Sequence, residues 1–152
     1  MFDVKKLTHL AAKALEDFAA NHQDETFYAV TIDAGALKMN SIEEHEESLA
    51  ELRAEFPRHY QSVEEIDELK YNSGDWRYTI IKFRGESDEE AKENGFDEDL
   101  YNDHYDTSDE EQKTSEYRNS MEAILIALKE RNAFNSLRLT EDFVMRINEH
   151  GY

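Results

Sequence analysis

The chain has 152 residues, of which 39% are hydrophobic, and its formal net charge at pH 7 is −19. This length is typical of a single domain, and eight Phe, eight Tyr and one Trp supply apolar area that a disordered acidic protein lacks. The absence of cysteine excludes disulfides, thiolate nucleophiles and thiolate zinc sites, and the charge argues against binding nucleic acid or anionic lipid.

The first predicted element is an amphipathic helix between Phe2 and Ala20. Its apolar residues recur at steps of three and four, at Val4, Leu7, Leu10, Ala11, Ala14, Leu15 and Phe18. Charged residues interrupt this stretch throughout, which is unlike a signal peptide or a membrane span. We therefore expect a cytoplasmic protein whose first helix packs on the core.

A hairpin is predicted next. Residues 27–33 are β-branched and aromatic, as in a strand, and residues 34–36 are small enough to turn the chain. Residues 37–40 then form a short returning strand.

A second amphipathic helix is predicted from Ser41 to Pro57. Ser41 and Glu44 have the spacing of a capping box, and apolar residues recur at helical spacing until the proline. Its outward side is acidic, with candidate partner-binding residues at Glu43, Glu44, Glu46 and Glu47. Ser62 and Glu65 repeat the capping spacing, which indicates another short helix or turn.

The middle of the chain is expected to add extended segments at residues 69–71 and 78–83, on either side of a turn at 72–76. The single tryptophan, Trp76, is interpreted as a core aromatic residue whose indole N–H finds a carbonyl. Contact with a partner is the less favoured interpretation.

A long helix is predicted from Tyr117 to about Asn132, and residues 137–140 and 143–147 have the composition of one or two final strands. The order of these elements predicts an α+β fold, with amphipathic helices packed on a mostly antiparallel sheet. We expect one globular domain over residues 1–152.

Residues 86–111, which we call the acidic segment, interrupt this pattern just before the last long helix. They contain thirteen carboxylates and one lysine, Lys92, so the segment has a net charge of −12. A solvated acidic loop is the expected structure. Phe96, Tyr101 and Tyr105 lie among the acids and serve either as buried anchors of the loop or as exposed anchors for a partner.

An anionic surface of this kind fits a basic protein partner. The candidate contact residues are Asp97, Glu98, Asp99, Tyr101, Asp103, Tyr105 and Asp106, with the four glutamates of the second helix as a secondary patch. The alternative is that the acidic segment only keeps the chain in solution while partners bind elsewhere.

Motifs for catalysis or for a cofactor are not found. The six histidines, at 9, 22, 45, 59, 104 and 150, have no recognised ligand spacing. A calcium loop starting at Asp97 fails, because Tyr101 holds its fifth position and Asn102 its sixth. The sequence also lacks a Gly-x-Ser-x-Gly elbow. We therefore predict no enzyme activity, no metal and no cofactor, with a cryptic hydrolase as the remaining alternative.

Three stretches resemble a known family. They are the run Glu25–Asp33, the run Ser73–Tyr78 with its Asp-Trp pair, and the run Asn119–Lys129 followed by Phe134. Together they resemble small bacterial proteins grouped as unknown-function family 4303. The resemblance implies a small acidic α+β protein of the kind found beside polymorphic toxins, where such proteins serve as immunity partners. It supplies no catalytic residues.

Overall fold

The computed structural model describes residues 1–147, and within them it shows an α+β fold built on a four-stranded mixed sheet. The strand order is β3-β2-β1-β4. Neighbours β1 and β2, and β2 and β3, are antiparallel, whereas β1 and β4 are parallel. The strands are β1 (Thr26–Asp33), β2 (Ala36–Ser41), β3 (Tyr78–Lys82) and β4 (Arg138–Ile147).

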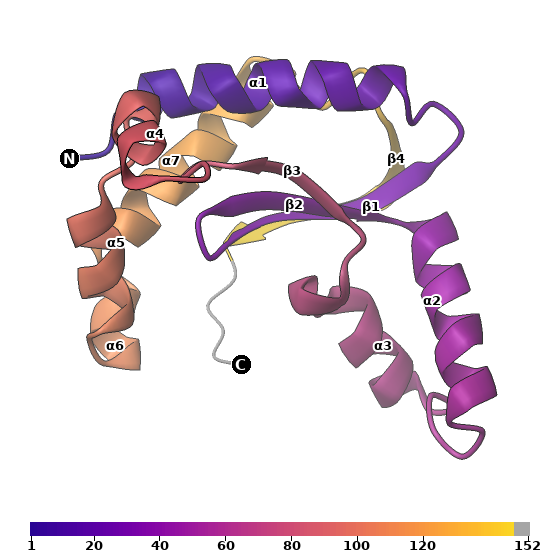
Figure 1. The fold of residues 1–152 in the computed structure, drawn as a ribbon. Helices are drawn as coiled ribbons and strands as arrows, with labels where there is room; N and C mark the ends of the chain where they lie inside the picture. Colours follow the sequence, from indigo (N-terminus) through magenta and orange to yellow (C-terminus); the bar gives the residue numbers. More distant parts are fainter. Residues whose placement is uncertain (148–152) are drawn as a thin grey trace.

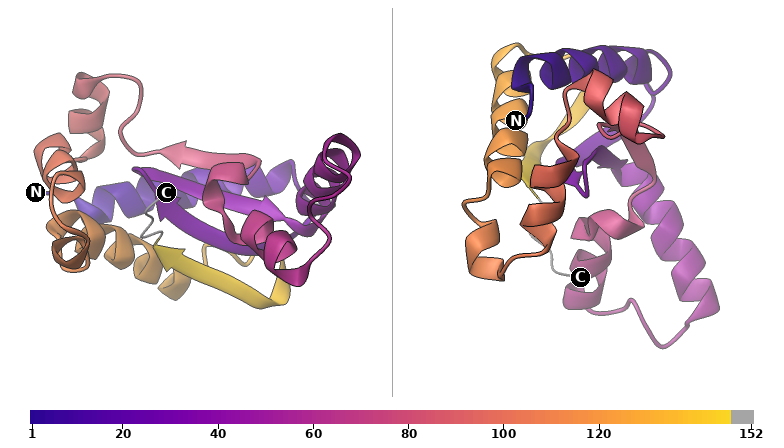
Figure 2. Two further views of the ribbon diagram at one scale, coloured as in Figure 1. Left: turned by 90° about the horizontal axis from the view of Figure 1, so that it is seen from below. Right: turned by 60° about the vertical axis from the view of Figure 1, so that its left-hand side comes forward.

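Helices surround this sheet on three sides (Figure 1). Helices α1 and α7 lie together across one face, α2 and α3 project from one end, and α4, α5 and α6 stack at the opposite end (Figures 1 and 2). Their bounds are α1 (Val4–Ala20), α2 (Ile42–Glu55), α3 (Val63–Tyr71), α4 (Asp88–Asn94), α5 (Glu98–Tyr105), α6 (Asp109–Gln112) and α7 (Glu116–Glu130), with a 3-10 turn η1 (Ser73–Asp75).

The core lies between the sheet and the pair α1 and α7. Helix α1 buries Leu7, Ala11 and Leu15 completely, as its spacing predicts, and β1 contributes Val30 and Ile32 from the sheet. On α7 the buried stripe is Tyr117, Met121, Ile124, Leu125 and Leu128. Both long helices predicted from periodicity are thereby confirmed.

The β1–β2 hairpin brings Ile32 opposite Leu37 and closes through Ala34 and Gly35. Both turn residues have positive φ, 49° and 73°, as two-residue hairpin turns require. A Cβ on Gly35 would come within 3.3 Å of Phe96, a residue of the acidic segment. The hairpin tip therefore lies directly against that segment.

The second face of the sheet is polar where α3 approaches it. The Tyr28 hydroxyl donates to the Lys70 carbonyl oxygen at 2.5 Å and accepts from the Asn40 amide nitrogen at 3.0 Å. The Trp76 indole nitrogen donates to the same Lys70 oxygen at 2.8 Å, as expected, but Trp76 is half-buried and lies outside the core rather than in it.

Two sequence expectations are wrong. Residues 69–71 do not form a strand but the last turn of α3, which Ser62 caps by accepting from the Glu65 amide. The acidic segment is not a loop, since most of it forms α4, α5 and α6. The final strand is one element, β4, with an irregular register against β1.

Candidate functional site

The acidic segment is helical because each of its three helices has a side-chain cap. Ser87, Asp97 and Ser108 accept hydrogen bonds from the amides of residues 90, 100 and 111. The first turns of all three helices are acidic. Carboxylates there interact favourably with the partial positive charge of the helix N-terminus, so these acids stabilise the short helices.

The inner side of the acidic segment is aromatic and belongs to the core. Phe96 is 4% exposed and its ring centroid lies 5.1 Å from that of Phe2. Tyr101 is 9% exposed and packs edge-on against Tyr117 of α7 at 5.1 Å. Phe96 and Tyr101 are thus buried anchors that hold the segment to α7 and the N-terminus, and Tyr101 does not present its ring to a partner.

Tyr105 and His104 occupy the outer edge of this aromatic cluster. Tyr105 is 37% exposed, and burial of its hydroxyl raises its pKa to about 12. His104 is 8% exposed, and its Nδ1 lies 2.5 Å from the Ser115 hydroxyl that begins α7. Burial lowers the pKa of His104, as does the nearby Arg118. Of the two predicted tyrosine contacts, only Tyr105 reaches the surface.

Two of the candidate acids bind groups of the chain itself. Glu98 forms a bidentate pair with the Arg84 guanidinium at 2.9 and 3.1 Å, and Arg84 also lies over the Tyr101 ring at 4.7 Å. Asp97 accepts from the N-terminal amine, and that hydrogen bond lowers its pKa. These two carboxylates therefore fix the position of α5 rather than facing solvent freely.

The other acids of the segment point outward. Asp99, Asp103 and Asp106 are exposed on α5 and at its C-cap. The exposed set continues along α4 and α6 with Glu86, Asp88, Glu89, Glu90, Glu93, Asp109, Glu110 and Glu111. Exposed Lys92 lies among these acids on α4, and Lys82 lies beside Glu86 at 3.9 Å and Lys113 beside Glu110 at 3.1 Å. The exposed carboxylates of the segment are therefore carried by α4, α5, α6 and their flanking residues.

The secondary patch on α2 is not part of this surface. Helix α2 and helix α5 lie at opposite ends of the sheet (Figures 1 and 2). Glu43 accepts from the Thr26 amide at 2.7 Å, and Glu44 accepts from the Tyr78 hydroxyl at 3.1 Å. Glu46 and Glu47 are exposed. Two of the four glutamates thus have structural contacts that the sequence pattern does not reveal.

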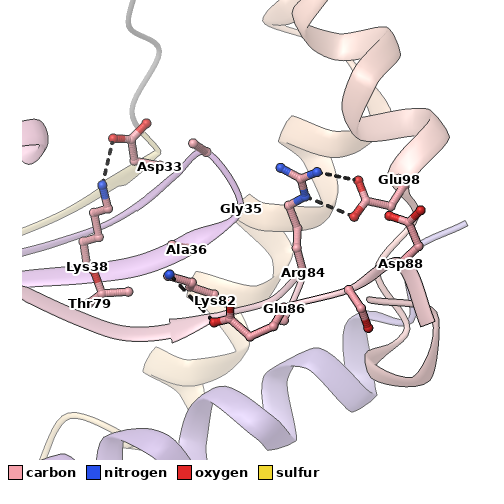
Figure 3. A pocket seen from close by; sticks show the side chains of 13 residues that line it. Asp33, Gly35, Ala36, Lys38, Thr79, Lys82, Arg84, Glu86, Asp88 and Glu98 are labelled. Carbon is pink, nitrogen blue, oxygen red and sulfur yellow. Dashed lines mark hydrogen bonds and ion pairs between the residues drawn. The ribbon is translucent and has the colours of Figure 1, made fainter. Parts of the chain in front are cut away.

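A pocket of about 410 Å³ lies where the hairpin tip meets the acidic segment (Figure 3). Strands β2 and β3 provide Lys38 and Lys82, and Arg84 and Glu98 close its far side. Sequence reasoning missed this pocket, because its walls come from residues 33–38, 79–88 and 98. No local spacing marks residues that meet only through the fold.

Asp33, with a side chain that is 6% exposed, is more buried than the other charged residues that line the pocket. Its carboxylate accepts from the Ser73 hydroxyl at 3.0 Å and lies 3.6 Å from the Lys38 ammonium. Ser73 thus donates to a carboxylate that faces a cation, and this hydrogen bond holds η1 against the sheet.

The histidines are dispersed in the structure. His22 stacks on Phe18 at 3.8 Å, whereas buried His45 lies near Tyr28 at 6.1 Å on the other face of the sheet. His150 lies outside the described residues. Among residues 1–147, no group of three or more His, Asp or Glu side chains is placed to hold a metal ion.

A protein-family model matches most of the chain. Residues 7–151 match the model of a family described as a domain of unknown function, DUF4303. The chain belongs to this family. No curated protein and no solved structure matches this DUF4303 chain. In the part of the chain that the structure describes, none of the helices has the length and apolarity needed to cross a membrane.

Proposed function

We propose that this DUF4303 protein is a cytoplasmic bacterial binding protein, and most concretely an immunity protein that neutralises a cognate toxin. The partner is a basic protein domain, and the contact surface is the outward side of the acidic segment. Asp99, Asp103 and Asp106 are its centre, with Tyr105 as an aromatic contact at its edge.

The observation that carries this proposal is the division of the acidic segment into two sides. Its aromatic side is buried against Phe2 and Tyr117, while most of its carboxylates are exposed on capped helices. A segment that only kept the chain in solution would need no such anchoring. Ordered helices hold the charges in a fixed pattern, so little conformational entropy is lost when a partner binds.

The negative charge of this surface favours a basic partner, such as a toxin that acts on nucleic acid. A toxin that cleaves nucleic acid carries Lys and Arg side chains for phosphate contacts. A fixed set of carboxylates complements those cations, speeds association and blocks the substrate at the same time. The alternative, a segment that only solubilises an interaction domain, predicts that removing these charges leaves binding unchanged.

The test is co-expression with the product of the adjacent reading frame. The variant Asp99→Asn, Asp103→Asn, Asp106→Asn removes three exposed charges and leaves Phe96 and Tyr101 in the core. The matched control is Glu64→Gln, Asp67→Asn, Glu68→Gln, which removes three exposed charges from α3. Both variants are first checked for wild-type stability by urea unfolding.

We expect the wild type and the α3 control to protect growth and to co-purify with the neighbouring product. The α5 variant should protect poorly and bind about 10- to 100-fold more weakly. Equal protection by the α5 variant and the control contradicts the acidic surface as the contact. A neighbouring product that is harmless and does not bind the wild type contradicts the immunity function itself.

A further inference from the structure

The pocket at the hairpin tip contains two lysines on one face of the sheet, Lys38 on β2 and Lys82 on β3. Lys82 pairs with Ala36, and Lys38 lies two residues further along β2, so both side chains leave the sheet on the same side (Figure 3). Ala36 lies between them, and its methyl group leaves room that a larger side chain would fill. The lining therefore has a hollow between two lysines.

A bulge in β3 brings Lys82 to this face. The register against β2 shifts between Leu37 and Lys38, which leaves Ile80 as an extra residue on β3. Strict alternation would place Thr79 and Lys82 on opposite faces of the sheet, because they are three residues apart. The bulge puts both on the face of the pocket, where the Thr79 hydroxyl adds a further hydrogen-bonding group.

Neither lysine forms a direct hydrogen bond with its acidic neighbour. The Lys38 ammonium lies 3.6 Å from the Asp33 carboxylate, and the Lys82 ammonium lies 3.9 Å from the Glu86 carboxylate. These are the only ion pairs of the two lysines within residues 1–147. A direct N–H···O hydrogen bond spans about 2.7–3.2 Å, and an ammonium has three donors. Both lysines therefore keep donors for an acceptor that enters the pocket.

The acids of the lining differ in how firmly they are held. They are Asp33, Glu86, Asp88 and Glu98. Glu98 holds Arg84 in a bidentate pair, so both of these charges are fixed in the wall. Glu86 is different, because its side chain is 82% exposed. An exposed ion pair contributes little to stability, so an anion that enters the pocket can replace Glu86 beside Lys82.

We propose that this pocket binds a small organic anion whose phosphate or carboxylate group lies between Lys38 and Lys82. Lysine ammonium groups bind such oxyanions through charge-assisted hydrogen bonds. The volume of about 410 Å³ lies within the range of about 300–1,000 Å³ that is typical of small-molecule sites. The site goes beyond the proposed binding function, because its two lysines attract an anion, whereas a basic partner contacts the carboxylates of α5.

The test is titration of the full chain with inorganic phosphate and, separately, with succinate, while sodium chloride keeps the ionic strength constant. Gly35 and Gly85 line the pocket, so their backbone amide NMR signals report binding there. We expect both signals to shift with at least one anion at up to about 10 mM, well above a Kd of about 1 mM. The anion that binds more tightly distinguishes a phosphate ligand from a carboxylate ligand. If neither anion moves these signals, the proposal is overturned.

Two exposed residues of the pocket should change the affinity in opposite directions. Lys82→Gln removes one ammonium and should weaken binding of the anion about tenfold. Glu86→Gln removes the competing carboxylate and should strengthen binding about two- to fivefold. The two side chains are 62% and 82% exposed, so neither change disturbs the core.

Each variant has a control with the same change of charge. Lys13→Gln removes an exposed lysine of α1, and Glu89→Gln removes an exposed glutamate of α4, and neither residue lines the pocket. Both controls should bind the anion nearly as the wild type does. If Lys82→Gln binds as tightly as Lys13→Gln, or Glu86→Gln binds no more tightly than Glu89→Gln, the anion does not lie beside Lys82 and the proposal is overturned.

Discussion

A single hydrogen bond of the Tyr117 hydroxyl joins α7 to the β1–β2 hairpin. It lies 2.8 Å from the Gly35 amide nitrogen, from which it accepts. Burial raises the pKa of Tyr117 well above its usual range, so it stays protonated at neutral pH. This single hydroxyl therefore fixes the turn that forms one wall of the pocket.

Tyr117→Phe should lower the free energy of unfolding by about 1–3 kcal/mol, because it leaves the buried Gly35 N–H without this acceptor. Tyr60→Phe is the matched control, since it removes a tyrosine hydroxyl in the connection between α2 and α3, away from the hairpin, and should change stability little. Urea unfolding measures both. Equal effects of the two variants would show that the Gly35 contact does not stabilise the turn.

The buried histidine His104 should make the stability of the protein depend on pH. It is packed against Tyr105 and Tyr117, near Ser115 and Arg118, and its pKa is lowered from 6.5 by burial. The unfolded chain therefore binds a proton at a higher pH than the folded chain does. The contribution of His104 is fully present above about pH 6.5 and decreases as the pH falls through the folded pKa.

His104→Gln should thus flatten the loss of stability between about pH 7.5 and about pH 5.5. His9→Gln, a change at an exposed histidine of α1, is the control. Urea unfolding at both pH values gives the difference in the free energy of unfolding between each variant and the wild type. A difference for His104→Gln that does not change with pH would rule out titration of this buried histidine as its source.

Single elements of the fold were predictable wherever one periodicity dominated. The stripe on α1 and the buried run of β1 specify their structure locally, and the capping spacing of Ser41 and Glu44 marks the start of α2. The same spacing recurs in Ser87 and Glu90, where the density of acids suggested a loop instead. Local capping outweighs repulsion between neighbouring carboxylates at that point.

The candidate site was less predictable, because its decisive contacts are distant in sequence. Tyr101 is buried by Phe96, Tyr117 and the Arg84 guanidinium, and nothing in residues 86–111 distinguishes it from an exposed tyrosine. Asp97 and Glu98 look like their neighbours in the sequence but face internal cations. Asp99, Asp103 and Asp106 remain predicted contacts, now with known exposure.

The turn between α4 and α5 depends on the backbone conformation of Gly95. Gly95 ends α4 with a φ of 84°, and a Cβ there would lie 2.6 Å from the Asp3 Cβ. Gly95→Ala should destabilise the protein by about 1 kcal/mol or more, through backbone strain and this collision. Asp3 begins α1, so the change also loosens the contact between the acidic segment and the first helix.

Gly74→Ala is the matched control for this junction. The Gly74 Cβ would lie 3.2 Å from a side-chain oxygen of Asn72, and its φ is not positive. Urea unfolding measures the loss of stability in each variant. Limited proteolysis within residues 86–111 measures how far the acidic segment loosens. Similar stability and cleavage of both variants would show that the acidic segment does not depend on the Gly95 turn.

Charge is distributed unevenly over the whole molecule, and this asymmetry relates the fold to the proposed function. The acidic segment accounts for −12 of the net charge of −19 and lies at one end of the sheet. Phe96 and Tyr101 of the segment are buried in the core, so the carboxylates on its outward side can face a partner. The fold thus presents a rigid anionic surface beside an ordinary hydrophobic core.

The proposed binding site is tested most directly by the salt dependence of binding. Calorimetric titration of the chain with the product of the adjacent reading frame should give a Kd that rises steeply with salt, because the contact consists of complementary charges. In the variant Asp99→Asn, Asp103→Asn, Asp106→Asn the rise should be clearly shallower, while the α3 control keeps the wild-type slope. A wild-type Kd that does not change with salt, or an α5 variant with the wild-type slope, would contradict the acidic surface as the binding site.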